Sequence, residues 1–197
     1  MCAYLPADVI MNYCSQCGSA VVQRVPPGDH LPRYVCDHCT TVHYQNPKIV
    51  AGCIAEWNDQ ILLCKRAIEP QYGRWTLPAG FMENGETTQA AATRETWEEA
   101  QANLANVSLY GLFNLPYINQ VYIIFRGELV DGKAAAGTES LEVKLYREGD
   151  IPWHDIAFPV VFEVLERYFA DRKTGEFVTR ISDIVRNPDR STTVTRY

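Results

Sequence analysis

Three glutamates crowd into a five-residue stretch of the chain, at Glu95, Glu98 and Glu99. Their spacing of i, i+3 and i+4 places all three carboxylates on one face of a helix, with neighbouring Cβ atoms about 5–6 Å apart. Like charges this close destabilise a helix, and the adjacent cation in the sequence is Arg94. Mg²⁺ or Mn²⁺ takes hard oxygen ligands and would neutralise such a group. A solvated acidic face is the alternative, because charge runs are usually exposed to water.

Four of the seven cysteines form two pairs with C-x2-C spacing, separated by 18 residues: Cys14, Cys17, Cys36 and Cys39. A two-residue gap lets a tight turn point both sulfurs at one ion, and two such turns complete a tetrahedron around Zn²⁺. Four cysteines leave no coordination position for water, so we expect a structural rather than a catalytic zinc ion. His38 and His43 are spare ligands nearby, and we expect neither to coordinate.

The segment that carries these cysteines differs in composition from the rest of the chain. Residues 12–46 are poor in leucine and isoleucine and contain a Pro-Pro-Gly-Asp turn signal. Such a stretch cannot build an apolar core of its own, and we expect the zinc ion to hold it together as a small module. From Pro47 onwards the pattern changes to apolar strands.

The glutamates must be presented by a framework of strands and helices. Apolar and alternating runs predict strands at 48–57, 60–66, 107–114, 120–129 and 142–146. Helices are predicted at 87–101, which carries the glutamates and is capped by Thr87 or Thr88, and at 159–172. This mixture favours an α/β fold with a mixed sheet. The last residues, 173–197, are weakly patterned, and we expect a loose C-terminal tail there.

The overall composition is that of an ordinary globular protein and narrows the range of partners. The 197 residues include 47% apolar and 21% charged side chains, which suffices for a packed core. Eighteen lysines and arginines against 24 acidic residues give a net charge of −6, which argues against nucleic acid as the main partner. No apolar run approaches the roughly 18–20 residues of a membrane span, and the first residues lack the pattern of a secretory signal. We therefore expect a cytoplasmic protein with reduced thiols that acts without a membrane.

The surroundings of the glutamates resemble the Nudix box, G-x5-E-x7-R-E-U-x-E-E-x-G-U, where U is a bulky aliphatic residue. The chain matches the first glycine and every charged position of this box: Gly80, Glu86, Arg94, Glu95, Glu98 and Glu99. Three positions depart from it, at Thr96, Gln101 and Ala102, and none of them carries a catalytic group.

This resemblance implies a Nudix-type α/β/α sandwich with a mixed sheet, preceded here by a small zinc-ribbon module. We expect the zinc ribbon at 12–46, the Nudix hydrolase domain at 47–172 and the tail at 173–197. In this family the glutamates of the box bind Mg²⁺ or Mn²⁺, and the enzymes hydrolyse a nucleoside diphosphate linked to another moiety.

The resemblance also implies a role for each matching residue. Four groups would bind the divalent metal: Glu95, Glu98, Glu99 and the carbonyl oxygen of Ala79. Glu86 and Arg94 would orient the site rather than take part in bond making. Family members commonly take a general base, or a further metal-binding carboxylate, from outside the box, and Glu139 and Glu142 are the candidates here. Solvated loop charges are the alternative for these two residues.

Other side chains are candidates for contacts with the substrate. Arg66 follows Lys65 at the end of a predicted strand and could bind phosphate. Three aromatic rings could stack on adenine or isoalloxazine: Trp75, Phe81 and Tyr117. Trp75 could equally belong to the core.

Three further residues are expected to have no part in the chemistry. We expect Trp97 to pack away from the glutamates, and Cys53 and Cys64 to be inert buried thiols.

A zinc ribbon in front of a Nudix domain resembles two groups of enzymes, the NADH pyrophosphatases and the FAD/ADP-ribose pyrophosphatases. The NADH type carries a run like S-Q-P-W-P-F-P-x-S after its box, whereas residues 111–120 read G-L-F-N-L-P-Y-I-N-Q. Residues 116–125 followed by 137–142 are more similar to the FAD/ADP-ribose group.

We therefore expect cleavage of FAD or ADP-ribose to AMP plus FMN or ribose 5-phosphate. The enzymatic alternative is an NADH pyrophosphatase. The other alternative is a nucleotide-sensing or nucleic-acid-binding regulator, against which the intact glutamates and the negative charge weigh. The partner is expected to be a small nucleotide, and families of this kind commonly form homodimers.

Overall fold

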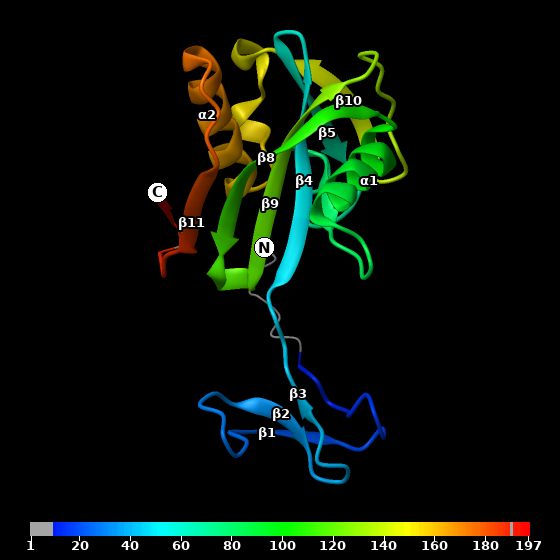
Figure 1. Ribbon diagram of the computed structural model, residues 1–197, viewed down its shortest axis with the longest axis vertical. Helices are drawn as coiled ribbons and strands as arrows, with labels where there is room; N and C mark the ends of the chain where they lie inside the picture. Colours follow the sequence, from blue (N-terminus) through cyan, green and yellow to red (C-terminus); the bar gives the residue numbers. More distant parts are fainter. Residues whose placement is uncertain (1–9, 190) are drawn as a thin grey trace. The chain divides into compact units, whose positions relative to one another are not determined.

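The computed structural model describes residues 10–189 and 191–197 of the chain. The chain forms two compact units, the first ending at Pro47 and the second running from Lys48 to Tyr197 (Figure 1). The boundary falls where the composition of the sequence changes. Residues 1–9, in which we expected no secretory signal, lie outside the described part of the chain.

The first unit is a three-stranded antiparallel sheet of the order β1-β2-β3. Its strands are β1 (Val21–Arg24), β2 (Arg33–Cys36) and β3 (Val42–His43). Its buried hydrophobic residues, among those described, are Cys14, Val35 and Cys36. Two of these three are cysteines, so this unit has very little apolar core besides its thiols.

The second unit is built on one mixed sheet, which contains nine strands in the described part of the chain. The strands are β4 (Lys48–Trp57), β5 (Gln60–Arg66), β6 (Trp75–Thr76), β7 (Ala79–Phe81), β8 (Leu104–Leu115), β9 (Gln120–Leu129), β10 (Ser140–Tyr146), β11 (Arg180–Arg186) and β12 (Thr192–Arg196). Their order is β10-β5-β4-β9-β8-β11-β12, with β6 paired to β5 and β7 to β4. The β4–β9 and β8–β11 pairs are parallel, and the other pairs are antiparallel.

Helices α1 (Thr88–Ala100) and α2 (Pro159–Thr174) cover opposite faces of this sheet (Figure 1). Three short 3₁₀ helices complete the described elements: η1 (Pro116–Ile118), η2 (Glu148–Asp150) and η3 (Trp153–Asp155). Alternate residues of β4 serve the two faces, because successive side chains of a strand point in opposite directions. Ile54 packs in the cluster that contains Leu165 of α2, whereas Cys53 packs in the cluster that contains Ala91 and Ala92 of α1. The predicted α/β/α sandwich with a mixed sheet is thereby confirmed.

The C-terminal segment differs from the expectation of a loose tail. Residues 180–186 form β11, which pairs in parallel with β8, and residues 192–196 form β12, which pairs antiparallel with β11. Ser182 and Ile184 of β11 are fully buried. The strands were missed because their stability comes from β8 and α2, which lie far away in the sequence.

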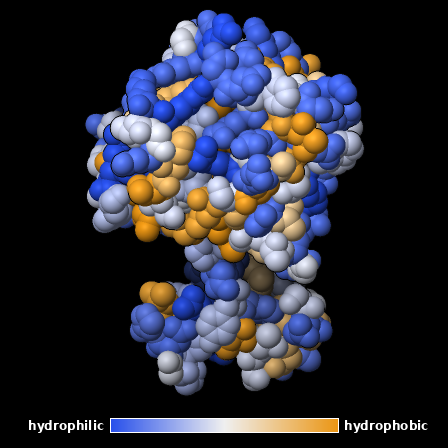
Figure 2. Space-filling view, turned by 45° about the horizontal axis from the view of Figure 1, so that its top comes forward, coloured by the Kyte–Doolittle hydropathy of each residue, from blue (hydrophilic) through white to orange (hydrophobic). Residues whose placement is uncertain are grey.

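The surface of the second unit is largely polar. Figure 2 shows hydrophilic side chains over most of the visible face, interrupted by separate hydrophobic areas. Among the described residues, no helix is both long and apolar enough to cross a membrane.

Candidate active site and cysteine cluster

Helix α1 is formed by local signals and held against the sheet by small side chains. The hydroxyl of Thr87 caps its N-terminus by accepting a hydrogen bond from the backbone N–H of Ala90 at 3.1 Å. The buried Ala91, Ala92 and Ala100 let the helix lie close to the strands. The helix ends at Gln101, whose φ of 47° is left-handed, as at the glycine of the Nudix box.

The two departures from the box at Thr96 and Ala102 do not disturb this packing. Thr96 is fully buried, and its hydroxyl donates to the carbonyl of Ala92 at 2.8 Å. Ala102 is buried within an apolar cluster beside Leu62. Trp97, which we expected to pack, is instead 51% exposed. The face of α1 toward the sheet is filled by small residues and glutamates, so the indole lies on the outer side.

The three glutamates of α1 differ widely in exposure. The side chain of Glu98 is 54% exposed, that of Glu95 is 12% exposed, and Glu99 is buried, with 7% of its surface accessible. A solvated acidic face would expose all three carboxylates, so two of them do not fit that alternative.

Arg94 links the glutamates of the loop and of the helix. Its guanidinium donates to both carboxylate oxygens of Glu86, at 3.1 and 2.8 Å. Its Nη1 donates to Glu95 at 2.7 Å and to Glu98 at 2.9 Å, and its Nη2 donates to the carbonyl of Phe81 at 3.3 Å. One arginine thus binds three carboxylates, one from the loop before α1 and two from α1 itself.

Glu99 is not compensated by this network. Its Oε2 is buried and has no hydrogen-bond partner among the described residues. The pKa of Glu99 is raised to about 8, chiefly by burial and then by repulsion from Glu95, while Arg66 and a hydrogen bond with the backbone of Ala79 act in the opposite direction. Burial also raises the pKa of Glu95, with further contributions from Glu98 and Glu139. The surroundings of Glu95 and Glu99 therefore disfavour their ionised forms, which an added cation would stabilise.

The strand β7 brings backbone atoms to the same place. A Cβ atom on Gly80 would lie 2.3 Å from a carboxylate oxygen of Glu95, so a larger residue at this position would displace that carboxylate. Ala79, the preceding residue, pairs with Gly52 of β4, and its backbone lowers the pKa of Glu99 through a hydrogen bond. The carboxylates of Glu95 and Glu99 and the carbonyl of Ala79 are hard oxygen donors, and one oxygen of the buried Glu99 is unpaired among the described residues. Donors of this kind fit Mg²⁺ or Mn²⁺.

Glu139 joins these glutamates through the loop between β9 and β10. The backbone N–H of Gly137 donates to the carbonyl of Glu99 at 3.0 Å, at the C-terminal end of α1. A Cβ atom on Gly137 would lie 1.7 Å from the carbonyl oxygen of Glu98. The carbonyl of Glu139 accepts from the N–H of Ala67 at 2.8 Å, and its carboxylate contributes to the raised pKa of both Glu95 and Glu99. The sequence analysis did not identify Gly137 as the residue that lets this loop approach α1. The available signal was its position two residues before the candidate acid Glu139.

Glu142 lies elsewhere. It pairs with Lys65 of β5 in the sheet register, and the two charged groups are 4.0 Å apart. Lys65 lies over the ring of Trp75, at 5.7 Å from its centroid, and Trp75 belongs to the core under α2. Glu142 is therefore on the face of the sheet opposite to α1, whereas Glu139 is beside α1.

The four candidate substrate contacts occupy different environments. Trp75 is 5% exposed and packs edge-on against Tyr146, so its ring is not available for stacking on a base. Phe81 is 50% exposed, and Lys48 lies 4.9 Å from its ring centroid. Tyr117 lies in η1 and packs partly against the core. Arg66 donates to the carbonyl of Pro70 at 2.9 Å and acts electrostatically on Glu99.

The first unit brings the four cysteines of the two C-x2-C pairs together. All four sulfur atoms of Cys14, Cys17, Cys36 and Cys39 lie within 4.8 Å of one another. The Nε2 atom of His43 lies 3.3 Å from the sulfur of Cys14, while His38 is not part of the cluster. Four convergent sulfurs with little apolar core around them fit a structural Zn²⁺ ion. Cys53 and Cys64 are buried in the sheet, and burial raises the pKa of the Cys64 thiol, which agrees with inert thiols.

Family models match both units. The model described as Nudix N-terminal, a zinc ribbon, matches residues 12–45, and the NUDIX domain model matches residues 46–171. The second match covers well over half of the chain. The chain belongs to the Nudix hydrolases.

Individual Nudix relatives support this membership. The ADP-ribose pyrophosphatase of Methanocaldococcus jannaschii is 31% identical over 113 residues, which are 55% of this chain and 67% of that protein. The NAD-capped RNA hydrolase NudC of Escherichia coli is 29% identical over 144 residues, 72% of this chain. The chain spans about half the length of the NAD-capped RNA hydrolases that it matches, 45% in Pseudomonas aeruginosa and 53% in Escherichia coli.

A solved Nudix structure extends the similarity to most of the chain. The crystal structure of a NUDIX hydrolase from Nitrosomonas europaea is 52% identical, with a TM-score of 0.86, and covers 89% of this chain and 99% of that one. The predictions of a Nudix hydrolase and of an N-terminal zinc ribbon are confirmed.

Proposed function

We propose that this Nudix hydrolase cleaves the pyrophosphate bond of ADP-ribose or FAD, with Mg²⁺ or Mn²⁺ as its cofactor, and releases AMP plus ribose 5-phosphate or FMN. The observation that carries the proposal is a buried oxygen of Glu99 that has no partner among the described residues. Glu95 lies within electrostatic reach of Glu99 and shares the Arg94 guanidinium with Glu98. Removing such a carboxylate from water costs free energy, and a function that needs its charge gives a reason to keep it.

In this proposal Glu95, Glu98, Glu99 and the carbonyl of Ala79 hold the divalent metal. When bound, the metal neutralises the pyrophosphate, polarises its P–O bonds and lowers the pKa of bound water. Arg94 and Glu86 keep the carboxylates in place through the hydrogen bonds described above.

We propose Glu139, rather than Glu142, as the general base. Glu139 lies within electrostatic reach of Glu95 and Glu99 and is held at both ends of its loop by backbone hydrogen bonds. Its carboxylate would accept a proton from water as the water oxygen forms a bond to phosphorus. The bond from phosphorus to the bridging oxygen breaks, and the second phosphate leaves with that oxygen.

The substrate contacts follow from exposure. Phe81 is half-exposed, its ring lies beside the positive charge of Lys48, and its backbone carbonyl accepts from Arg94. We propose that this ring stacks on the adenine or isoalloxazine system. Arg66, close to Glu99, would contact a phosphate, and Tyr117 would line the substrate side of η1.

The choice of substrate rests on two observations that favour different candidates. Residues 111–120 lack the run typical of NADH pyrophosphatases, and one relative is an ADP-ribose pyrophosphatase. The similarity to NAD-capped RNA hydrolases favours a second candidate, a substrate with an NAD or NADH moiety, free or at the end of an RNA.

A substrate panel tests these proposals. The purified full chain is incubated with ADP-ribose, FAD, NADH and NAD-capped RNA, each with Mg²⁺ or Mn²⁺, and the products are separated by chromatography. We expect AMP plus ribose 5-phosphate or FMN to form fastest. Preferential cleavage of NADH or of the RNA cap would replace the first candidate by the second. No hydrolysis of any substrate with either ion, together with specific nucleic-acid binding, would favour the regulator.

A further inference from the structure

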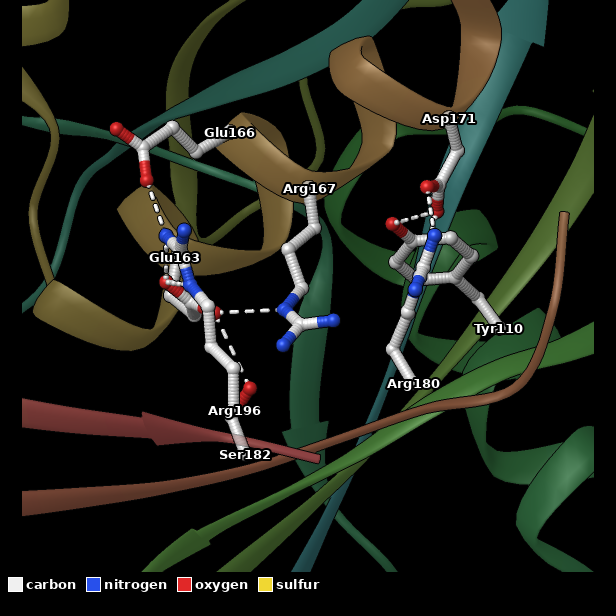
Figure 3. Close-up of polar contacts among 8 residues, drawn as sticks. All are labelled: Tyr110, Glu163, Glu166, Arg167, Asp171, Arg180, Ser182 and Arg196. Atoms are coloured by element: carbon white, nitrogen blue, oxygen red, sulfur yellow. Dashed lines mark hydrogen bonds and ion pairs between the residues drawn. The ribbon is translucent and has the colours of Figure 1, made fainter. Parts of the chain in front are cut away.

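A group of charged side chains lies outside the candidate active site, between α2 and the two C-terminal strands. It joins Glu163, Glu166, Arg167 and Asp171 of α2 to Tyr110 of β8, Arg180 and Ser182 of β11 and Arg196 of β12 (Figure 3). Because α1 and α2 cover opposite faces of the sheet, this group is separated from the glutamates of α1 by the sheet itself.

Two buried carboxylates fix the arginines of this group. Glu163, 3% exposed, accepts from Arg167 Nε at 2.9 Å and from Arg196 Nε and Nη2 at 3.0 and 2.7 Å. Asp171, 4% exposed, accepts from Arg180 Nε at 3.0 Å and also pairs with its Nη2. These pairs use one side of each guanidinium and hold it in a fixed orientation.

The remaining donors of the arginines face a hollow. A depression of about 370 Å³ is lined by Glu166, Arg167, Ala170, Asp171, Arg180 and Arg196. Within the described chain, no hydrogen bond is found for either Nη atom of Arg167 or for the Nη1 atoms of Arg180 and Arg196. Figure 3 shows one outer nitrogen of Arg167 directed away from Glu163, on the side of Arg180.

Arg167 presents two donors to this hollow. Its side chain is 9% exposed, yet only its Nε is paired with a carboxylate in the part of the chain that the structure describes. Its two Nη atoms are not among the buried, unpaired side-chain atoms of the described residues, so both are open to the solvent of the hollow. Three guanidinium groups with unused donors around one hollow match the planar, forked recognition of a phosphate.

We propose that this hollow binds a phosphate group, either as free phosphate or as a phosphate monoester. The three arginines are balanced by three acidic residues, Glu163, Glu166 and Asp171, so the side chains of the site are formally neutral. A bound phosphate dianion would therefore bring the site to a net charge of −2. The chain as a whole carries a charge of −6 and repels anions, so binding here would be specific to the arginine cluster. Such a site is independent of the proposed pyrophosphatase activity, since it uses no residue of α1.

Two variants test the site without removing a buried group. Ala170 is exposed and lines the hollow, so Ala170→Glu places a carboxylate among the arginines and should leave the helix folded. Glu166, half-exposed, pairs with Arg196 Nη2, so Glu166→Gln removes a negative charge that competes with an anion for Arg196. The matched control is Glu176→Gln, the same substitution at an exposed position outside the hollow.

Binding is measured by isothermal titration calorimetry on the zinc-loaded full chain with inorganic phosphate, and separately with AMP, without added divalent cation. We expect one site per chain, weakened by at least about tenfold in Ala170→Glu and tightened by about threefold or more in Glu166→Gln, with Glu176→Gln unchanged. AMP binding that is lost in Ala170→Glu identifies a phosphate monoester as the ligand, and binding of phosphate alone identifies the free anion.

Three results would overturn the proposal. The first is that the parent chain binds no phosphate at concentrations up to about 20 mM. This is far above the dissociation constant expected for a site with charge-assisted hydrogen bonds. The second is binding that Ala170→Glu leaves intact, since the ligand would then sit elsewhere. The third is no gain of affinity in Glu166→Gln.

Discussion

Glu99 is both buried and incompletely hydrogen-bonded, a combination that lowers the stability of a protein. Its carboxylate is buried against the sheet, and one of its oxygens has no partner among the described residues. Arg94 satisfies Glu86, Glu95 and Glu98 instead. A buried carboxylate with an unpaired oxygen weakens a fold, so its presence indicates a role that needs the charge.

The first prediction concerns Glu99→Gln. The substitution keeps the shape of the side chain and removes a charge that burial and Glu95 disfavour, so the melting temperature without added divalent cation should not fall. Hydrolysis of ADP-ribose or FAD should fall by about a hundredfold or more, on the scale of a lost electrostatic contribution to the transition state. Both quantities are measured on one preparation, with Glu176→Gln as control. Full activity in Glu99→Gln would rule out metal binding by this residue.

The second prediction compares Glu139→Gln with Glu142→Gln. These glutamates are three residues apart, but only Glu139 acts electrostatically on Glu95 and Glu99, whereas Glu142 faces Lys65. We expect kcat to fall by about 10²-fold or more in Glu139→Gln, as for the loss of a general base, and to change little in Glu142→Gln. The acid limb of the pH–rate profile should disappear only in Glu139→Gln. The reverse result would make Glu142 the base.

At the scale of elements, α2 holds the C-terminal strands through Glu163. Burial alone would raise the pKa of Glu163, but hydrogen bonds from Arg196, Arg167 and Ser182 hold it below its usual value. The ordinary pKa of this group is 4.5. Because the folded protein then binds this proton less readily than the unfolded chain, the stabilisation is present above about pH 4.5 and is lost as the pH falls through the folded pKa.

The third prediction is therefore a pH-dependent effect of Glu163→Gln. At pH 7 the variant leaves the buried Arg167 without its carboxylate, and we expect a loss of stability on the order of 3 kcal/mol, as when one partner of a buried pair is removed. The difference in melting temperature between parent and variant should shrink as the pH is lowered below about 4. Glu166→Gln is the control, because its exposed pair with Arg196 contributes little. A difference that stays constant with pH would contradict this assignment.

At the scale of the whole molecule, the two units depend on different forces. The second unit buries aliphatic and aromatic side chains on both faces of its sheet. The first unit has Val35 and two cysteines as its buried hydrophobic residues among those described, and four converging sulfurs. Its folded state should therefore depend on bound zinc, whereas that of the second unit should not.

The fourth prediction follows for Cys36→Ser. We expect bound zinc, measured by atomic absorption, to fall from about one ion per chain toward zero, because three thiolates hold the ion much less tightly than four. The thermal transition of the first unit should be lost, and that of the second unit and its hydrolytic rate should be retained. Cys2→Ser, the same substitution outside the two pairs, is the control. Full zinc content and parental stability in Cys36→Ser would count against the four-cysteine site.

Patterns contained within short stretches of sequence predicted much of this protein correctly. The bounds of β4, β5 and β9 agree with the strands predicted at 48–57, 60–66 and 120–129. Thr87 caps α1, and Pro159 and Gly175 delimit α2, as their local preferences suggest. The C-x2-C pairs and the box of glutamates are local as well, since their geometry follows from a turn or from the period of a helix.

Contacts between distant segments decided the rest. Whether Glu139 or Glu142 lies beside α1 depends on the register of β10 against β5, which shifts between Ser140 and Glu142. Successive side chains of a strand point to opposite faces of the sheet, but the sequence does not say which face a helix covers. A bulge in the strand also changes which residues share a face. The burial of Trp75 was likewise decided by distant segments, because its ring packs in the core cluster that includes the buried residues of α2.

The C-terminal strands show the same limit most clearly. β11 pairs with β8, about seventy residues earlier in the chain, and its polar Ser182 is buried because Glu163 of α2 accepts its hydroxyl hydrogen. A weak local pattern becomes a strand when a parallel neighbour supplies backbone partners and a helix supplies the covering layer. The sequence by itself therefore determined the chemistry that the chain carries, and the tertiary structure determined which charged groups share a site, because that depends on pairings that no local preference encodes.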